Sequence, residues 1–173
     1  GTYDRGQLQR GFQVYREACA ACHGLTRVAI RNLRGLGYSE EQVIALAAEY
    51  EVEDGPDSYG DMFMRAAIPA DRFPAPFPNP EAAAAANNGA VPPDLSLMAK
   101  ARTAERGFPR FVFDIFTQYE AGGADYIYSL LQGYQDPPEG YESQPGTYYN
   151  PYFMAGTSLS MPQPFADGMI SYN

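Results

Sequence analysis

The stretch Cys19-Ala20-Ala21-Cys22-His23 decides the fold that this sequence predicts. It holds both cysteines and the single histidine of the 173-residue chain. Two cysteines with a two-residue spacer, followed at once by histidine, are the signature of a covalently attached c-type haem. The spacer sets the two sulfurs at the separation of the two haem vinyl groups. We therefore expect one covalently bound haem c, with thioether bonds to Cys19 and Cys22 and with His23 as the proximal iron ligand.

Two other kinds of site use the same spacer, a redox dithiol and half of a zinc site. A structural zinc ion needs four ligands, and the sequence contains no further cysteine or histidine. A thioredoxin-like dithiol expects a βαβ context, which the flanking sequence lacks. Haem attachment is the interpretation that spacing, order and composition favour together.

The second axial position on the iron must be a methionine or stay open, because no second histidine exists. Met161 precedes Pro162, which biases it toward an extended backbone that can present its thioether sideways. A role as a gap-filling core residue fits any of the six methionines equally well. The residue pattern alone leaves the choice open between Met161 and the others, Met62, Met64, Met98, Met154 and Met169.

The net charge of the sequence indicates which classes of binding partner the protein can have. Twelve basic and 21 acidic residues give a net charge of −9, which repels nucleic acid and attracts basic proteins. No apolar run approaches the roughly 20 residues that a membrane helix needs. The acidic residues gather in one stretch that is a candidate docking surface, with a merely solvated face as the alternative: Glu40, Glu41, Glu49, Glu51, Glu53, Asp54, Asp57 and Asp61.

Periodicity predicts a mainly α protein, a single domain over residues 1–173, with long irregular loops and little or no sheet. Asp4 is predicted to cap a first helix that carries both cysteines on its buried face, and Ser39 to cap a second. Further helices are expected over 81–86, 95–105, 108–119 and 126–132, the last capped by Asp125. Irregular chain is expected over 27–37, 51–61, 72–80 and 133–173.

One stretch of the sequence is especially specific, Asn87-Asn88-Gly89-Ala90-Val91-Pro92-Pro93-Asp94-Leu95-Ser96, preceded by Asn79-Pro80-Glu81. It resembles the cytochrome c1 family, the haem subunits of bc1 complexes. The resemblance extends to Gly11-Phe12-Gln13-Val14-Tyr15, to the segment from Asp125 to Tyr134, and to Tyr149-Asn150-Pro151-Tyr152-Phe153. It covers nearly the whole chain and implies a class I cytochrome c-like haem domain.

The resemblance also implies a site. His23 and Met161 match the axial ligands, and Arg102 matches an arginine set against a haem propionate, with a solvated helix arginine as its alternative. Tyr126 matches a tyrosine beside that arginine. The remaining matches belong to the pocket wall, where ordinary core packing is the alternative: Asn87, Pro92, Pro93, Leu131, Phe153 and Leu159.

The function implied by the resemblance is electron transfer within the bc1 complex. The chain would pass single electrons from the Rieske iron–sulfur protein to a soluble basic c-type cytochrome, while cytochrome b oxidises quinol. It would not be an enzyme on its own. The expected location is the periplasmic side of a bacterial membrane, equivalent to the mitochondrial intermembrane space.

Two departures from the family pattern complete the expectation. Family members continue past the methionine into a C-terminal helix and a membrane anchor, so the chain resembles a truncated soluble core. The segment from Thr103 to Glu120 resembles an insertion that is typical of bacterial forms. Three rival functions are a freestanding soluble electron carrier, a haem enzyme or gas sensor with a labile sixth ligand, and a non-haem interaction module.

Overall fold

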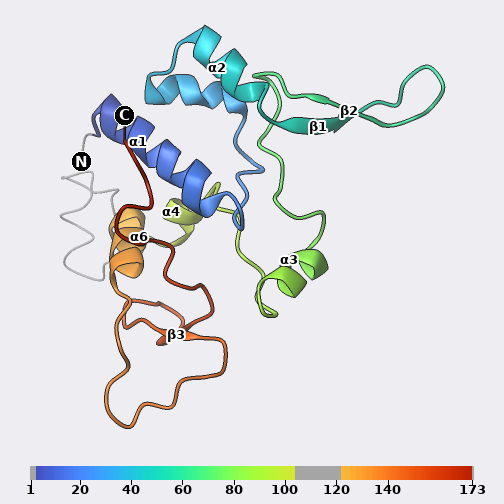
Figure 1. Ribbon diagram of the computed structural model, residues 1–173. Coiled ribbons are helices and arrows are strands. Elements are labelled where there is room, and N and C mark those ends of the chain that lie inside the picture. Colours follow the sequence, from blue (N-terminus) through green and yellow to red (C-terminus); the bar gives the residue numbers. More distant parts are fainter. Residues whose placement is uncertain (1–2, 104–121, 173) are drawn as a thin grey trace.

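Short helices and long connections make up the protein, whose computed structural model describes residues 3–103 and 122–172 (Figure 1). The structure is mainly helical, as the sequence predicts, with two small antiparallel sheets of two strands each. In chain order the elements are α1 (Arg5–Val14), η1 (Tyr15–Cys19), η2 (Ile30–Leu36), α2 (Glu40–Ala47), β1 (Glu51–Asp54), β2 (Phe63–Ala66), α3 (Pro80–Ala86), α4 (Met98–Ala101), α6 (Gly122–Gln132), β3 (Tyr148–Tyr149) and β4 (Ser158–Leu159).

The first helix carries the haem motif at its end, but not in the way that the periodicity predicts. Asp4 caps α1 as expected, because its carboxylate accepts a hydrogen bond of 2.9 Å from the Gln7 backbone N–H. The prediction that the α-helix continues to Cys22 is wrong. The α-helix ends at Val14 and widens into the π-helical turn η1, which ends at Cys19. A π-turn adds a residue to the helical ladder, so it re-aims the side chains that follow.

The main core lies where α1, η2, α2 and the base of the first sheet meet. Its buried members are Phe12, Ile30, Leu33, Val43, Ala47, Ala67 and Phe73. Residues 27–37 were expected to be irregular, and this prediction is wrong because they contain the 3₁₀-helix η2. Ile30, Leu33 and Leu36 recur every three residues, which is the period of that helix.

The capping box that Ser39 and Gln42 were predicted to form is present at the start of α2. The acidic segment 51–61 is irregular as predicted only after residue 54, because Glu51–Asp54 form the strand β1. Strand β1 pairs with β2, so that Glu51 lies opposite Ala66 and Asp54 opposite Phe63. The hairpin, residues 51–66, projects from the body as an arm (Figure 1).

The arm is tied to the body by one arginine. Arg65 forms ion pairs with Asp54 and with Asp71, which lies just beyond the hairpin. Both strands are largely exposed, so the alternation of Glu51, Val52 and Glu53 has no buried face that would mark it as a strand in the sequence.

Of the two helices predicted over 81–86 and 95–105, the first is present and the second is shorter than predicted. The helix expected over 81–86 is present as α3, and Asn79 caps it through a 2.8 Å bond from the Ala82 backbone N–H. The helix expected over 95–105 is, within the described residues, only the single turn α4. The helix expected over 108–119 and nearly all of the predicted insertion 103–120 lie outside the described residues.

Helices α4 and α6 pack at very short range. A Cβ atom on Gly123 would lie 1.5 Å from the Ala99 carbonyl oxygen, so only glycine permits this approach. Helix α6 begins at Gly122, which places Asp125 in its first turn and not at the predicted cap position.

The segment after α6 is irregular, as predicted, apart from the short β3–β4 pair, in which Tyr148 lies opposite Leu159. Its end returns to the N-terminal helix, where the Gln13 side chain donates to the Ser171 carbonyl at 3.0 Å (Figure 1). In the ranges 3–103 and 122–172, none of the helices has the length and apolar character needed to cross a membrane.

Candidate haem site

The haem motif forms a tight turn directly after η1. The backbone N–H groups of Cys22 and His23 both donate to the Cys19 carbonyl, at 3.1 and 2.8 Å. Both thiols are free and partly buried. Burial raises the pKa of the Cys19 thiol, and the neighbouring Cys22 raises it further. A redox dithiol depends on a lowered pKa, and the pKa of the Cys19 thiol is displaced in the opposite direction.

His23 is held in one ring orientation. Its Nδ1 lies 2.7 Å from the carbonyl oxygen of Pro93, and because a carbonyl only accepts, Nδ1 must carry the proton. In the neutral imidazole this tautomer leaves the lone pair on Nε2, the nitrogen that an iron ligand would use. Tyr15 supports the same turn, since its hydroxyl donates to the His23 carbonyl at 3.0 Å. Burial raises the pKa of Tyr15 to about 12, so the hydroxyl stays protonated at neutral pH.

A ladder of hydrogen bonds joins the loop after the motif to the loop that contains Pro93. The Leu95 N–H donates to the Gly24 carbonyl at 2.8 Å. Thr26 donates to one carboxylate oxygen of Asp94 twice, from its backbone N–H at 2.8 Å and from its hydroxyl at 2.9 Å. The other oxygen accepts from the Ser96 N–H at 2.8 Å. Although burial opposes ionisation, these bonds lower the pKa of Asp94 to about 2.

Met161 follows strand β4 after a single residue and is partly buried. The hydroxyl of Tyr134 donates to the Met161 carbonyl at 2.9 Å and approaches the Pro162 carbonyl at 3.3 Å. Burial raises the pKa of Tyr134 to about 12, so this donor also stays protonated. Four other methionines, Met62, Met64, Met154 and Met169, expose 50 to 59% of their surface. Met98 in α4 is the other partly buried methionine.

The other predicted pocket residues come from several elements. Arg102 lies at the end of α4 and is partly buried, as are Tyr126 and Leu131 of α6. The Tyr126 hydroxyl accepts a bond of 3.3 Å from the Met154 N–H. Three further residues are partly buried or buried, namely Pro92, Phe153 and, on β4, Leu159.

Hydrogen bonds show what two of the predicted wall residues do in the structure, Pro93 and Asn87. The exposed Pro93 meets His23 through its carbonyl. The Asn87 amide instead donates to the Ala83 carbonyl at 2.7 Å, so it closes the end of α3.

Sequence reasoning missed the residues that hold these loops in place. Thr26, Asp94, Tyr134 and Asn150 all make hydrogen bonds that connect segments distant in the sequence. A signal was available, since three of the four fall within the phrases that resemble cytochrome c1.

The whole chain is similar to known proteins of one family. The sequence profile of the Cytochrome C1 family matches residues 1–173. The chain is 54% identical over 177 residues to "Cytochrome b/c1" of Bradyrhizobium diazoefficiens, an alignment that covers all of this chain and 26% of that protein. It is 47% identical to cytochrome c1 of Rhodospirillum rubrum, covering 99% of this chain and 62% of the relative. It is 46% identical to the mitochondrial "Cytochrome c1, heme protein" of Saccharomyces cerevisiae, covering 99% and 50%.

The chain therefore spans 26 to 62% of the length of these relatives. The matched region includes the haem motif, the loop that contains Pro93 and the segment that contains Met161. Profile and relatives agree over the full length, and they show that this chain belongs to the cytochrome c1 family.

Proposed function

We propose that this chain relays single electrons as the haem-bearing part of a bc1 complex. The family implies one covalently bound haem c. The observation that carries the proposal is the 2.7 Å hydrogen bond between His23 Nδ1 and the Pro93 carbonyl, made beside two free thiols. It directs Nδ1 to a carbonyl acceptor and leaves Nε2 as the ring nitrogen for the iron, which is the arrangement that a haem-iron ligand needs.

The residues divide the work of holding the group. Cys19 and Cys22 would form the thioether bonds, while His23 Nε2 and the Met161 sulfur would bind the iron. The haem, when bound, supplies a one-electron couple between ferric and ferrous iron. Two protein ligands leave no coordination position for a substrate, so the site favours electron transfer over chemistry on a small ligand.

Partners and location extend the same proposal. We infer that electrons arrive from the Rieske iron–sulfur protein and leave to a soluble basic c-type cytochrome, on the periplasmic side of a bacterial membrane. The net charge of −9 supports a basic acceptor. One relative is named "Cytochrome b/c1", and that name supports association with cytochrome b, the site of quinol oxidation.

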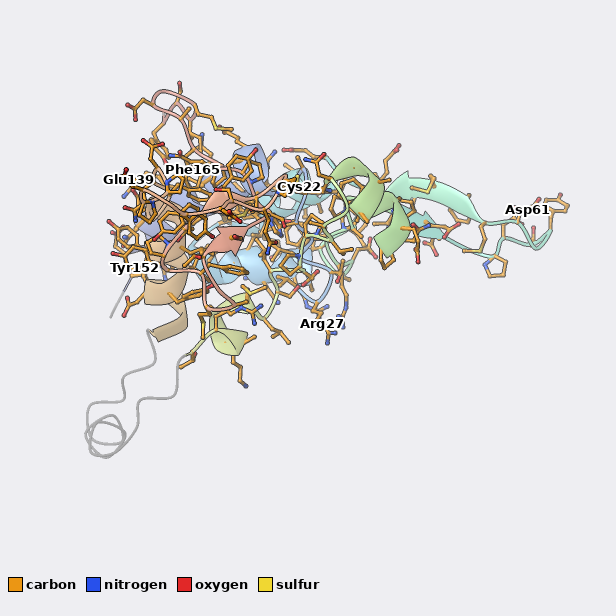
Figure 2. All side chains as sticks on the ribbon, turned by 90° about the horizontal axis from the view of Figure 1, so that it is seen from below. Cys22, Arg27, Asp61, Glu139, Tyr152 and Phe165 are labelled. Carbon is orange, nitrogen blue, oxygen red and sulfur yellow. The ribbon has the colours of Figure 1, made fainter. Side chains whose placement is uncertain are left out.

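The acidic stretch is a poor candidate for the acceptor's docking surface. Three of its carboxylates already form ion pairs, Glu40 with Arg34, Glu49 with Arg16 and Asp54 with Arg65. Asp61 lies at the far end of the arm, well away from Cys22 (Figure 2). An electron acceptor has to approach the haem closely, so we assign these carboxylates mainly to solvation of α2 and the arm.

Replacement of the proposed methionine ligand tests the function. Met161→Leu is expected to lower the reduction potential and to make the reduced protein bind carbon monoxide, because a thioether ligand is lost and a coordination position opens. Met98→Leu is the matched control, since Met98 is also partly buried but lies in α4. The measurements are redox titration and the optical spectrum of the reduced protein with and without carbon monoxide.

The outcomes separate the alternatives. Carbon monoxide binding by the unaltered protein would favour a haem enzyme or gas sensor. A change in Met98→Leu without one in Met161→Leu would overturn the ligand assignment. A denaturing gel that shows no covalently attached haem would overturn the proposed function itself.

A further inference from the structure

Beside the backbone bond from the Leu95 N–H to the Gly24 carbonyl, the two loops next to His23 are joined through one carboxylate that has no part in iron ligation. Residues Thr26 and Asp94 are 68 positions apart, yet Asp94 accepts both of the hydrogen bonds that Thr26 donates. The Arg27 N–H donates to the Ser96 hydroxyl at 3.0 Å in the same ladder. The loop after the haem motif is thus fastened to the loop that carries the carbonyl acceptor of His23.

The peptide plane explains why this fastening matters for the imidazole. The carbonyl of Pro93 belongs to the peptide unit that ends at the Asp94 Cα atom, so a rotation that moves the carbonyl also moves Asp94. Proline has no N–H through which this loop could be held directly, and two prolines precede Asp94. The Asp94 side chain therefore supplies an anchor that the backbone at Pro92 and Pro93 cannot supply.

We propose that Asp94 is a positioning residue for His23: its carboxylate, bound by Thr26 and Ser96, keeps the Pro93 carbonyl on Nδ1 and so fixes the orientation and basicity of Nε2. This inference rests on the proposed function, in which Nε2 binds haem iron. A hydrogen bond at Nδ1 makes the imidazole a stronger donor, which favours the ferric state. Loss of the anchor weakens that bond and raises the reduction potential.

The decisive comparison is between variants that keep and that remove the negative charge. Asp94→Ala removes both the charge and the hydrogen bonds. Thr26→Val removes only the hydroxyl bond and leaves the carboxylate in place, while Thr26→Ser retains the hydroxyl. Asp71→Ala is the matched control, because Asp71 also accepts from a backbone N–H, that of Ile68 at 2.8 Å, but it holds Arg65 near the arm.

The primary measurement is the solvent exchange rate of the His23 Nδ1 proton, followed by NMR in the reduced, diamagnetic protein with its haem attached. We expect this rate to rise at least tenfold in Asp94→Ala and several-fold in Thr26→Val. Thr26→Ser and Asp71→Ala should stay within twofold of the unaltered protein. The reduction potential, measured by redox titration, should rise in both of the variants that exchange faster.

Each outcome decides a different point. Exchange rates within twofold of the unaltered protein in both Asp94→Ala and Thr26→Val would overturn the positioning role. A higher potential in Asp94→Ala alone, with unchanged exchange, would show a simple charge effect and would overturn it as well. If Asp94→Ala does not mature with haem, the exchange rate of the His23 Nδ1 proton in Thr26→Val, compared with that in Thr26→Ser, still tests the positioning role. An unaltered protein whose spectrum shows no iron-bound His23 would instead overturn the proposed function.

Discussion

Replacement of Asn150 by alanine removes the only polar side chain that is fully buried among the described residues. Its Nδ2 donates to the Leu130 carbonyl at the end of α6 at 2.7 Å, and its Oδ1 accepts from the Tyr152 N–H at 3.0 Å. Its backbone N–H donates to the Thr157 carbonyl at 2.9 Å, next to β4. The side chain therefore joins α6 to the hairpin that leads to the Met161 segment.

The size of the effect follows from the two bonds. A group that loses its only partner costs about 1 to 3 kcal/mol, and the alanine leaves the Tyr152 N–H in that state. The Leu130 carbonyl loses its 2.7 Å bond and keeps only the longer 3.3 Å bond from the Gly133 N–H, a loss of about 0.5 to 1.5 kcal/mol. Packing here is tight, because a Cβ on Gly133 would lie 2.8 Å from Oδ1 of Asn150. We expect Asn150→Ala to lower the free energy of unfolding by about 3 kcal/mol, a large fraction of the about 5 to 15 kcal/mol of a typical domain.

Urea unfolding of the haem-loaded protein, followed by circular dichroism, measures this change. The midpoint should fall while the slope with urea stays the same, which is the behaviour of a change in stability alone. Asn32→Ala is the matched control, because Asn32 is exposed on η2 and its replacement should cost less than about 0.5 kcal/mol. A loss in Asn150→Ala no larger than the loss in the control would refute the reasoning.

Three further predictions rest on other contacts. Gly123→Ala should destabilise the protein by about 3 kcal/mol or more in the same urea assay, since its Cβ would meet the Ala99 carbonyl; a stability equal to that of the unaltered protein would exclude the observed helix contact. Because hydrogen bonds lower the pKa of Asp94 from 3.8 to about 2, its contribution to stability is present above pH 3.8 and is lost as the pH falls through 2. Solvent screening limits that contribution to about 1 kcal/mol, and the acid unfolding curve of Asp94→Asn should lack it; parallel curves would contradict the assignment. Neutralising Glu51 and Glu53 should barely change the salt dependence of oxidation by a basic c-type cytochrome in stopped flow, whereas a clear flattening would place docking on the arm.

Local spacing was sufficient for the features that depend on neighbours in the sequence. The two thiols and the histidine of the haem motif fall within five positions, so the sequence alone predicts their haem-binding chemistry. The caps at Asp4 and Ser39 were predicted for the same reason, because a capping side chain bonds to a backbone N–H three residues away.

Periodicity failed where the local geometry departs from the α-helix or where burial is weak. The series from Leu8 to Cys22 fits an α-helical period, yet the helix changes to a π-turn at Tyr15. The three-residue repeat at Ile30 belongs to a 3₁₀-helix, which the α-helical and strand periods do not detect. The arm was missed because a largely exposed hairpin shows little alternation of buried and exposed positions.

The orientation of His23, the proposed haem ligand, was decided only by the tertiary structure. His23 and Pro93 are 70 positions apart, and Tyr134 reaches the Met161 carbonyl across 27. The sequence by itself determined which atoms can bind a haem, because reactivity belongs to the side chains and to their spacing. It could not determine which carbonyl meets Nδ1 or which carboxylate holds that carbonyl, because these contacts form only when distant loops are brought together by packing, and packing leaves no local pattern in the chain.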